Sequence, residues 1–404
     1  MGANSSTRMP LEPLRAAKSA AFEAMIRAKA NIAATDFSIS SSLSRALDIL
    51  RALAAFLVVA NHIGEALFVF EDHLDPLNLL MFQCLYLGHH AVMLLFVVSG
   101  FLIGRAAIQC FTTDNQKVFD YGVDRITRIY VVLIPALMIG YVSDQILLAL
   151  STGSVFDYVA QRTSWLIFLG NAVGLQTILV PTFGSNGPLW SLACELWYYF
   201  MAPAFLVALF SAKPINRLIA LAAFVAALFF VSDDILHYGV IWCIGVLCWA
   251  PRRPWIPKWL AWGLMIGFLA TANNEYLWAN GWGFPHIFGT ALTVALIINA
   301  HRHDRVTPKA MRPSLSKFFA GFTYSLYLYH YPPLMIVLAL LMTNHFVPYG
   351  HMGVTEALVA CGLLVFLYAY SYALFWITER KYYGFRAFVR GKAAPLKRLA
   401  SSNP

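Results

Sequence analysis

Long apolar stretches recur along almost the whole chain, and they constrain its fold more than any other feature. Eleven of them lie between residues 46 and 378. Hydrophobic residues make up 59% of the chain and charged residues only 12%, half of the ~25% that is usual for a soluble domain. Most side chains therefore cannot face water. This predicts a multi-pass membrane protein and excludes a soluble enzyme, a disordered chain and a nucleic-acid-binding domain.

Each stretch is expected to be a helix, because backbone N–H and C=O groups in lipid must be satisfied within the segment. The fold class predicted is all-α, a polytopic membrane helix bundle. The stretches fall at about 46–70, 84–104, 129–150, 164–180, 188–210, 216–232, 235–250, 258–271, 285–300, 318–342 and 354–378.

The basic residues choose between ten and eleven crossings, because cytoplasmic loops carry an excess of lysine and arginine. If 164–180 folds back without crossing, 28 of the 29 basic residues lie on the side of the N-terminus, and Arg162 is the exception. If all eleven stretches cross, the split is 11 against 18. We therefore expect about ten transmembrane helices, a re-entrant segment at 164–180, and both termini in the cytoplasm.

The same pattern divides the chain into three parts. Residues 1–45 are a cytoplasmic N-terminal tail with no apolar run that could serve as a secretory signal. Residues 46–378 form the transmembrane domain, and residues 379–404 are a basic cytoplasmic C-terminal tail. No pattern indicates an oligomeric state.

Two ionisable residues of the first span share one face of a helix. Arg51 and His62 are eleven residues apart, which is close to three helical turns and places His62 roughly 16 Å deeper, near mid-membrane. A charged or ionisable side chain at this depth needs an explanation. Taken alone, His62 is equally read as a histidine that hydrogen-bonds a neighbouring helix.

Glu195 and His330 lie at a similar depth in two other spans. With His62 they predict one polar site inside the bundle, and a histidine beside a carboxylate is the usual equipment of general-base catalysis. The alternative is three unrelated hydrogen bonds between helices.

Arg125 and Arg128 open the third span and stack at i, i+3. With Arg51 they could form a guanidinium pocket suited to phosphates, although basic residues at a cytoplasmic boundary need no role beyond topology.

No metal site is expected. The pairs His89–His90 and His301/His303 have no carboxylate at ligand spacing, and the six cysteines include no CxxC pair.

Five motifs occur in an order that resembles the acyltransferase-3 family of integral membrane O-acyltransferases. They are LDILRALAAFLVVANH, LLFVVSGFLIGR, DRITRIY, GPLWSLACELWYYF and GFTYSLYLYHYPPL, and they cover residues from about 45 to 378. The resemblance implies a ten-helix core with cytoplasmic ends. It also implies transfer of an acyl group from cytoplasmic acyl-CoA to an extracytoplasmic glycan, a lipid-linked sugar or an antibiotic.

The resemblance assigns roles to particular residues. The arginine–ten residues–histidine motif falls on Arg51 and His62, with His62 as the catalytic residue, and the RxxR motif of acyl-CoA handling falls on Arg125 and Arg128. The SGF turn begins at Ser99.

Glu195 and His330 match the glutamate of the fifth motif and the late histidine. The chain departs from the family pattern where a proline usually follows RxxR closely, because here the first proline is Pro135.

The expected function is therefore acyl-CoA-dependent O-acylation. Arg51, Arg125, Arg128 and Ser99 would hold the donor, acetyl-CoA above all. His62, oriented by a carboxylate or another hydrogen-bond partner such as Glu195, would deprotonate a hydroxyl of a carbohydrate or glycolipid acceptor. Whether His62 is instead acylated stays open. The alternative is a transporter or flippase for a sugar or lipid-linked glycan, in the membrane of a bacterial cell.

Overall fold

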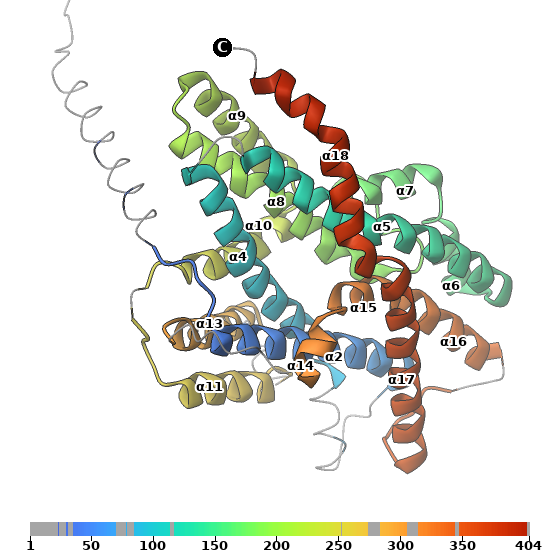
Figure 1. Ribbon diagram of the computed structural model, residues 1–404. Coiled ribbons are helices and arrows are strands. Elements are labelled where there is room, and N and C mark those ends of the chain that lie inside the picture. The colour runs from blue at the N-terminus through green and yellow to red at the C-terminus, as the bar shows by residue number, and fades with distance from the viewer. Residues whose placement is uncertain are drawn as a thin grey trace, which may run out of the picture.

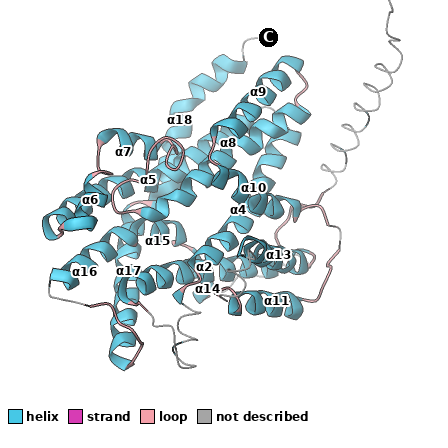
Figure 2. Cartoon of the chain, turned by 180° about the vertical axis from the view of Figure 1, so that it is seen from behind, coloured by secondary structure: helices cyan, strands magenta, loops and turns pink. Residues whose placement is uncertain are grey.

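The computed structural model describes residues 35–69, 85–113, 117–251, 253–273, 283–304, 314–343 and 347–401, and the single residues 23, 30 and 78. Within these residues every regular element is a helix, so the all-α prediction is confirmed (Figures 1 and 2). In chain order they are α2 (Ser41–Leu67), α4 (Gly88–Thr113), α5 (Lys117–Leu150), α6 (Gly153–Ala160), α7 (Trp165–Ala172), η1 (Gly187–Leu189), α8 (Trp190–Phe210), α9 (Pro214–Phe230), α10 (Asp233–Leu247), α11 (Lys258–Ala270), α13 (Gly283–Arg302), α14 (Leu315–Ala320), α15 (Thr323–Tyr329), α16 (Tyr331–Thr343), α17 (Val354–Ile377), η2 (Glu379–Lys381) and α18 (Tyr382–Ser401).

Several helices are long and apolar enough to cross a membrane, which makes the chain a multi-pass membrane protein. In the described part of the chain there are six, at Gly88–Cys110, Asp120–Leu150, Gly187–Phe210, Gly283–Arg302, Thr323–Thr343 and Val354–Gly391. The helices α9 and α11 are apolar but shorter. The count of ten crossings and the cytoplasmic placement of both termini stay predictions.

The segment 164–180 is folded back on itself. Its helix α7 has eight residues, about 12 Å long and far short of the ~30 Å of a bilayer core. The side chain of Asn171 donates to the carbonyls of Ile167 and Pro181 and accepts from the N–H of Phe183. Asn171, one of the polar residues that interrupt this stretch, therefore stabilises the reversal of the chain. The short length of α7 agrees with a segment that does not cross the membrane.

The stretch 318–342, expected as one span, is broken into α14, α15 and α16. Pro332 and Pro333 follow the break between α15 and α16, and neither has an N–H to donate to the carbonyl four residues earlier. The side chain of Asn186 donates instead to the carbonyl of Leu328 at 3.0 Å. His330 lies at this break.

The helix α4 packs against α2, α8, α10 and α13, and α11 and α13 lie at the opposite end of the molecule from α6 and α16 (Figures 1 and 2). At Gly100 a side chain is excluded, because a Cβ there would lie 2.0 Å from the carbonyl oxygen of Trp242 in α10. The expected turn at Ser99-Gly100-Phe101 was wrong, since all three residues lie inside α4. Gly100 serves the close approach of two helices.

Candidate active site

Two cavities of similar size lie inside the bundle. The first, here the arginine cavity, has a volume of about 400 Å³. The second, here the histidine cavity, has a volume of about 450 Å³. Arg51 lines the arginine cavity and His62 lines the histidine cavity. The face of α2 that these two residues were predicted to share therefore borders both cavities, one at each depth.

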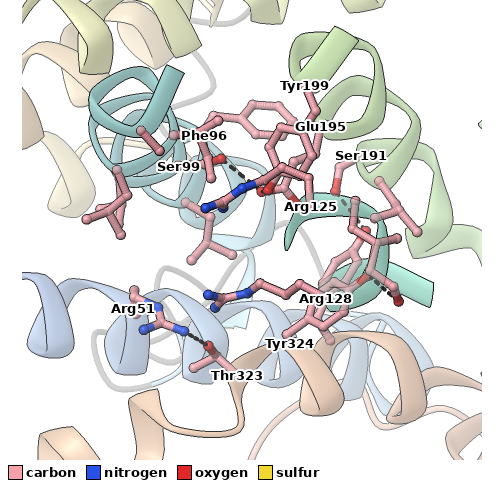
Figure 3. Close-up of a pocket in the computed structure, with 18 of the residues that line it drawn as sticks. Arg51, Phe96, Ser99, Arg125, Arg128, Ser191, Glu195, Tyr199, Thr323 and Tyr324 are labelled. Carbon is pink, nitrogen blue, oxygen red and sulfur yellow. Dashed lines mark hydrogen bonds between the residues drawn. The ribbon is translucent and has the colours of Figure 1, made fainter. Parts of the chain in front are cut away.

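The arginine cavity gathers guanidinium groups from three helices: Arg51 from α2, Arg105 from α4, and Arg125 and Arg128 from α5. Figure 3 shows Arg125 and Arg128 pointing into the space above Arg51. Arg51 donates to Oγ1 of Thr323 at 3.0 Å. In the described part of the chain, Arg105, Arg125 and Arg128 have no hydrogen-bonded or ion-paired acid, and Nε of both Arg105 and Arg125 is buried without a partner.

Glu195 lines the arginine cavity and is the single carboxylate among its lining residues. Its Oε1 accepts from Ser99 at 2.8 Å and from Tyr199 at 2.6 Å (Figure 3). The structure therefore brings together Ser99 and Glu195, which the sequence assigned to separate roles. It does not bring Glu195 to His62, so Glu195 as the partner that orients His62 was wrong.

The carboxylate beside His62 belongs to Glu65, one turn further along α2. Its Oε2 lies 3.3 Å from Nδ1 of His62, and its Oε1 accepts from Nδ2 of Asn61 at 2.8 Å. The Oδ1 of Asn61 in turn accepts from the N–H of Gly88 at 3.0 Å, at the start of α4. This chain fixes the carboxylate, and an Nδ1–H that donates to it leaves Nε2 of His62 with a free lone pair.

His330 is fully buried and stacks on His62, with ring centroids 5.3 Å apart. Its Nδ1 lies 2.9 Å from the carbonyl of Leu326 and 3.0 Å from that of Tyr327. Carbonyl oxygens only accept, so Nδ1 carries the proton. His330 is not among the residues that line either cavity, which places it behind His62.

The other histidines singled out in the sequence are dispersed. His89 lines the histidine cavity, Nε2 of His90 lies 3.2 Å from Nδ1 of His286, and His301 bonds to Ser42 and Trp262. The described residues contain no group of three or more histidine, cysteine, aspartate or glutamate side chains placed to hold a metal ion.

The C-terminal helix α18 lies across α5 (Figure 1). Asp124 accepts hydrogen bonds from Arg386 at 2.5 Å and from Arg390 at 2.8 Å. The hydroxyl of Tyr382 also donates to the carbonyl of Asp124. The helix α18 thus holds both the side chain and the backbone of Asp124, the residue next to Arg125.

Sequence reasoning missed four residues of this arrangement: Asn61, Glu65, Arg105 and Tyr327. Glu65 is at i+3 from His62, a spacing that puts its side chain within reach of that histidine. Arg105 ends the motif LLFVVSGFLIGR that was already singled out, but its spacing of six residues from Ser99 does not place the two on one face. Asn61 and Tyr327 are ordinary residues of an apolar helix, and only the fold shows their position.

The fold and the two cavities define a multi-pass membrane protein whose interior holds a cationic cavity beside a histidine–carboxylate pair. The chain belongs to the acyltransferase-3 family, whose model, described as an acyltransferase domain, matches residues 44–377. No curated protein and no solved structure matches the chain. The protein is accordingly a membrane acyltransferase.

Proposed function

We propose that the protein is an acyl-CoA-dependent O-acyltransferase of the bacterial inner membrane. The donor, acetyl-CoA, binds in the arginine cavity from the cytoplasmic side. The acceptor is a hydroxyl of an extracytoplasmic or membrane-linked glycan, and it enters the histidine cavity.

The observation that carries this proposal is the unbalanced charge of the arginine cavity. Four arginines and one glutamate line it, and that glutamate bonds to Ser99 and Tyr199 rather than to an arginine. Glu379 interacts electrostatically with Arg51 and Arg128 and offsets part of this charge. Positive charge left uncompensated in a low-dielectric interior is costly. A ligand that carries several phosphates would compensate it, and guanidinium groups bind phosphates through paired hydrogen bonds.

The chemistry follows from the orientation of His62. Its Nε2 would take the proton of the acceptor hydroxyl while the hydroxyl oxygen attacks the carbonyl carbon of the thioester. The carbon–sulfur bond then breaks, the thiolate takes up the proton from His62, and an ester and free CoA leave. Glu65 stabilises the imidazolium formed on the way, as a carboxylate does for a catalytic histidine. His330 is a positioning residue for His62. Glu195 is a positioning residue in the wall of the arginine cavity.

The histidine cavity suits a sugar. Trp190 and Tyr86 supply aromatic faces for the apolar side of a ring, and Asn61 and Asn273 supply amides. Aromatic stacking combined with a few polar groups is the usual way to bind such an acceptor.

Purified protein in proteoliposomes, incubated with labelled acetyl-CoA, tests the proposal. We expect saturable binding and slow release of free CoA with water as acceptor. His62→Gln should abolish the release but keep the binding, and Arg125→Gln with Arg128→Gln should weaken the binding. Absence of acetyl-CoA binding to the wild type, together with uptake of a sugar into the vesicles, would overturn the proposal in favour of transport.

A further inference from the structure

The arginine cavity and the histidine cavity share two lining residues, Val92 of α4 and Tyr327 of α15. The two cavities therefore meet at one place. The two residues at this place come from different helices, α4 and α15.

The side chain of Tyr327 is fixed across this boundary. Its hydroxyl lies 2.7 Å from Oγ of Ser191 and also donates to the carbonyl of Pro188. Ser191 lines the arginine cavity and Pro188 lines the histidine cavity. The phenol thus joins α15 to the start of α8 at the point where one cavity ends and the other begins.

The backbone of Tyr327 is tied to the histidine pair. Its carbonyl lies 3.0 Å from Nδ1 of His330, whose ring stacks on His62. The phenol at the boundary and the ring behind His62 are therefore both anchored by one short helix, α15, and its C-cap residue.

We propose that Tyr327, with Val92 opposite, forms the constriction through which the acyl group reaches the acceptor, and that Tyr327 sets the longest acyl chain transferred. The inference rests on the proposed function. A thioester held in the arginine cavity must place its carbonyl carbon at this boundary, beside a hydroxyl in the histidine cavity. The acyl chain beyond that carbon meets the phenol, so a two-carbon group fits and longer chains collide with the ring.

The same constriction would keep water away from the thioester. A phenol held by hydrogen bonds to Ser191 and Pro188 narrows the path between the histidine cavity and the arginine cavity. Loss of the ring should therefore raise the hydrolysis of acyl-CoA in the absence of an acceptor.

The test measures the release of free CoA by the full-length protein from acetyl-CoA, butyryl-CoA, hexanoyl-CoA and octanoyl-CoA. For Tyr327→Ala we expect the ratio of kcat/KM for octanoyl-CoA to that for acetyl-CoA to rise by about 10-fold or more, the range for methylene discrimination by an apolar pocket. Tyr327→Phe keeps the ring and should keep the ratio. Tyr141→Ala is the matched control, because Tyr141 of α5 is exposed and lines neither cavity.

Val92→Ala widens the constriction from the other side. We expect it to raise the same ratio of kcat/KM values, but by less than Tyr327→Ala does. A ratio within about twofold of the wild type in both Tyr327→Ala and Val92→Ala, well below the effect of even one methylene, would overturn the inference alone. If the wild type neither binds nor turns over any acyl-CoA, the proposed function fails and the inference fails with it.

Discussion

The carboxylate of Glu65 lies 3.3 Å from Nδ1 of His62, and the two residues are one turn apart on α2. The pair is local to one helix, so it forms whenever that helix forms. Asn61 and the N–H of Gly88 then fix Glu65 from the other side.

Glu65→Gln should reduce the turnover of acetyl-CoA by about 10²-fold and leave its affinity unchanged, because the imidazolium loses its stabilising charge while the arginine cavity is untouched. Steady-state release of free CoA measures both quantities. Glu356→Gln is the control, since Glu356 caps α17 and lines neither cavity. Turnover by Glu65→Gln equal to that of this control would contradict the role of Glu65.

Arg105→Gln should weaken the binding of CoA by about 10-fold or more, because a hydrogen bond to a charged group contributes about 1.5–3 kcal/mol. Titration calorimetry with CoA in detergent measures the change. Arg217→Gln removes an arginine that bonds to backbone carbonyls at the end of α8 and should bind CoA like the wild type. Equal affinities for the two variants would remove Arg105 from the donor site.

Gly100→Ala and Gly245→Ala should each destabilise the protein by about 1–3 kcal/mol, the usual cost of forcing a methyl group into a packed core. A Cβ on Gly245 would lie 2.0 Å from the carbonyl oxygen of Val97. Gly140→Ala in α5 meets nothing within 4 Å and should be neutral or slightly stabilising. Thermal unfolding in detergent compares the three, and a Tm for Gly100→Ala at or above that of Gly140→Ala would refute the close packing of α4 on α10.

Lys213 and Asp233 flank the short apolar helix α9, and the charge pattern puts them on opposite sides of the membrane. With the six native cysteines replaced, Lys213→Cys should react with an impermeant maleimide only in inverted vesicles. Asp233→Cys should react only in intact spheroplasts. Reaction of both from the same side would show that α9 does not cross and would lower the count of ten.

The all-α fold class and the polar residues within the apolar stretches could be predicted from the sequence, because both follow from local composition and spacing. Arg51 and His62 are an example, since eleven residues on one helix fix their common face. The partner of Glu195 could not be predicted in this way. Which helix faces which is decided by packing over the whole bundle, and it directs Glu195 to Ser99 of α4, whereas Tyr199 is a local partner four residues along α8.

Two local features of the sequence could have predicted details of the fold but were not used for this. Pro332 and Pro333 remove two backbone donors, which predicts the break at His330. The small residues Ser99 and Gly100 within an apolar run predict a close helix contact as readily as a turn, and the apolar residues around them favour the helix. The shared lining of the two cavities by Val92 and Tyr327 is different, because it depends on two helices, α4 and α15, that are distant in the sequence.

The thin boundary at Val92 and Tyr327 has an electrical consequence. Where a membrane protein is hollowed at two depths, the transmembrane voltage falls mainly across the solid part that remains between the hollows. If the arginine cavity opens to the cytoplasm and the histidine cavity to the other side, as the proposed function requires, that part is the boundary at Val92 and Tyr327, and the field would be concentrated at the reacting atoms.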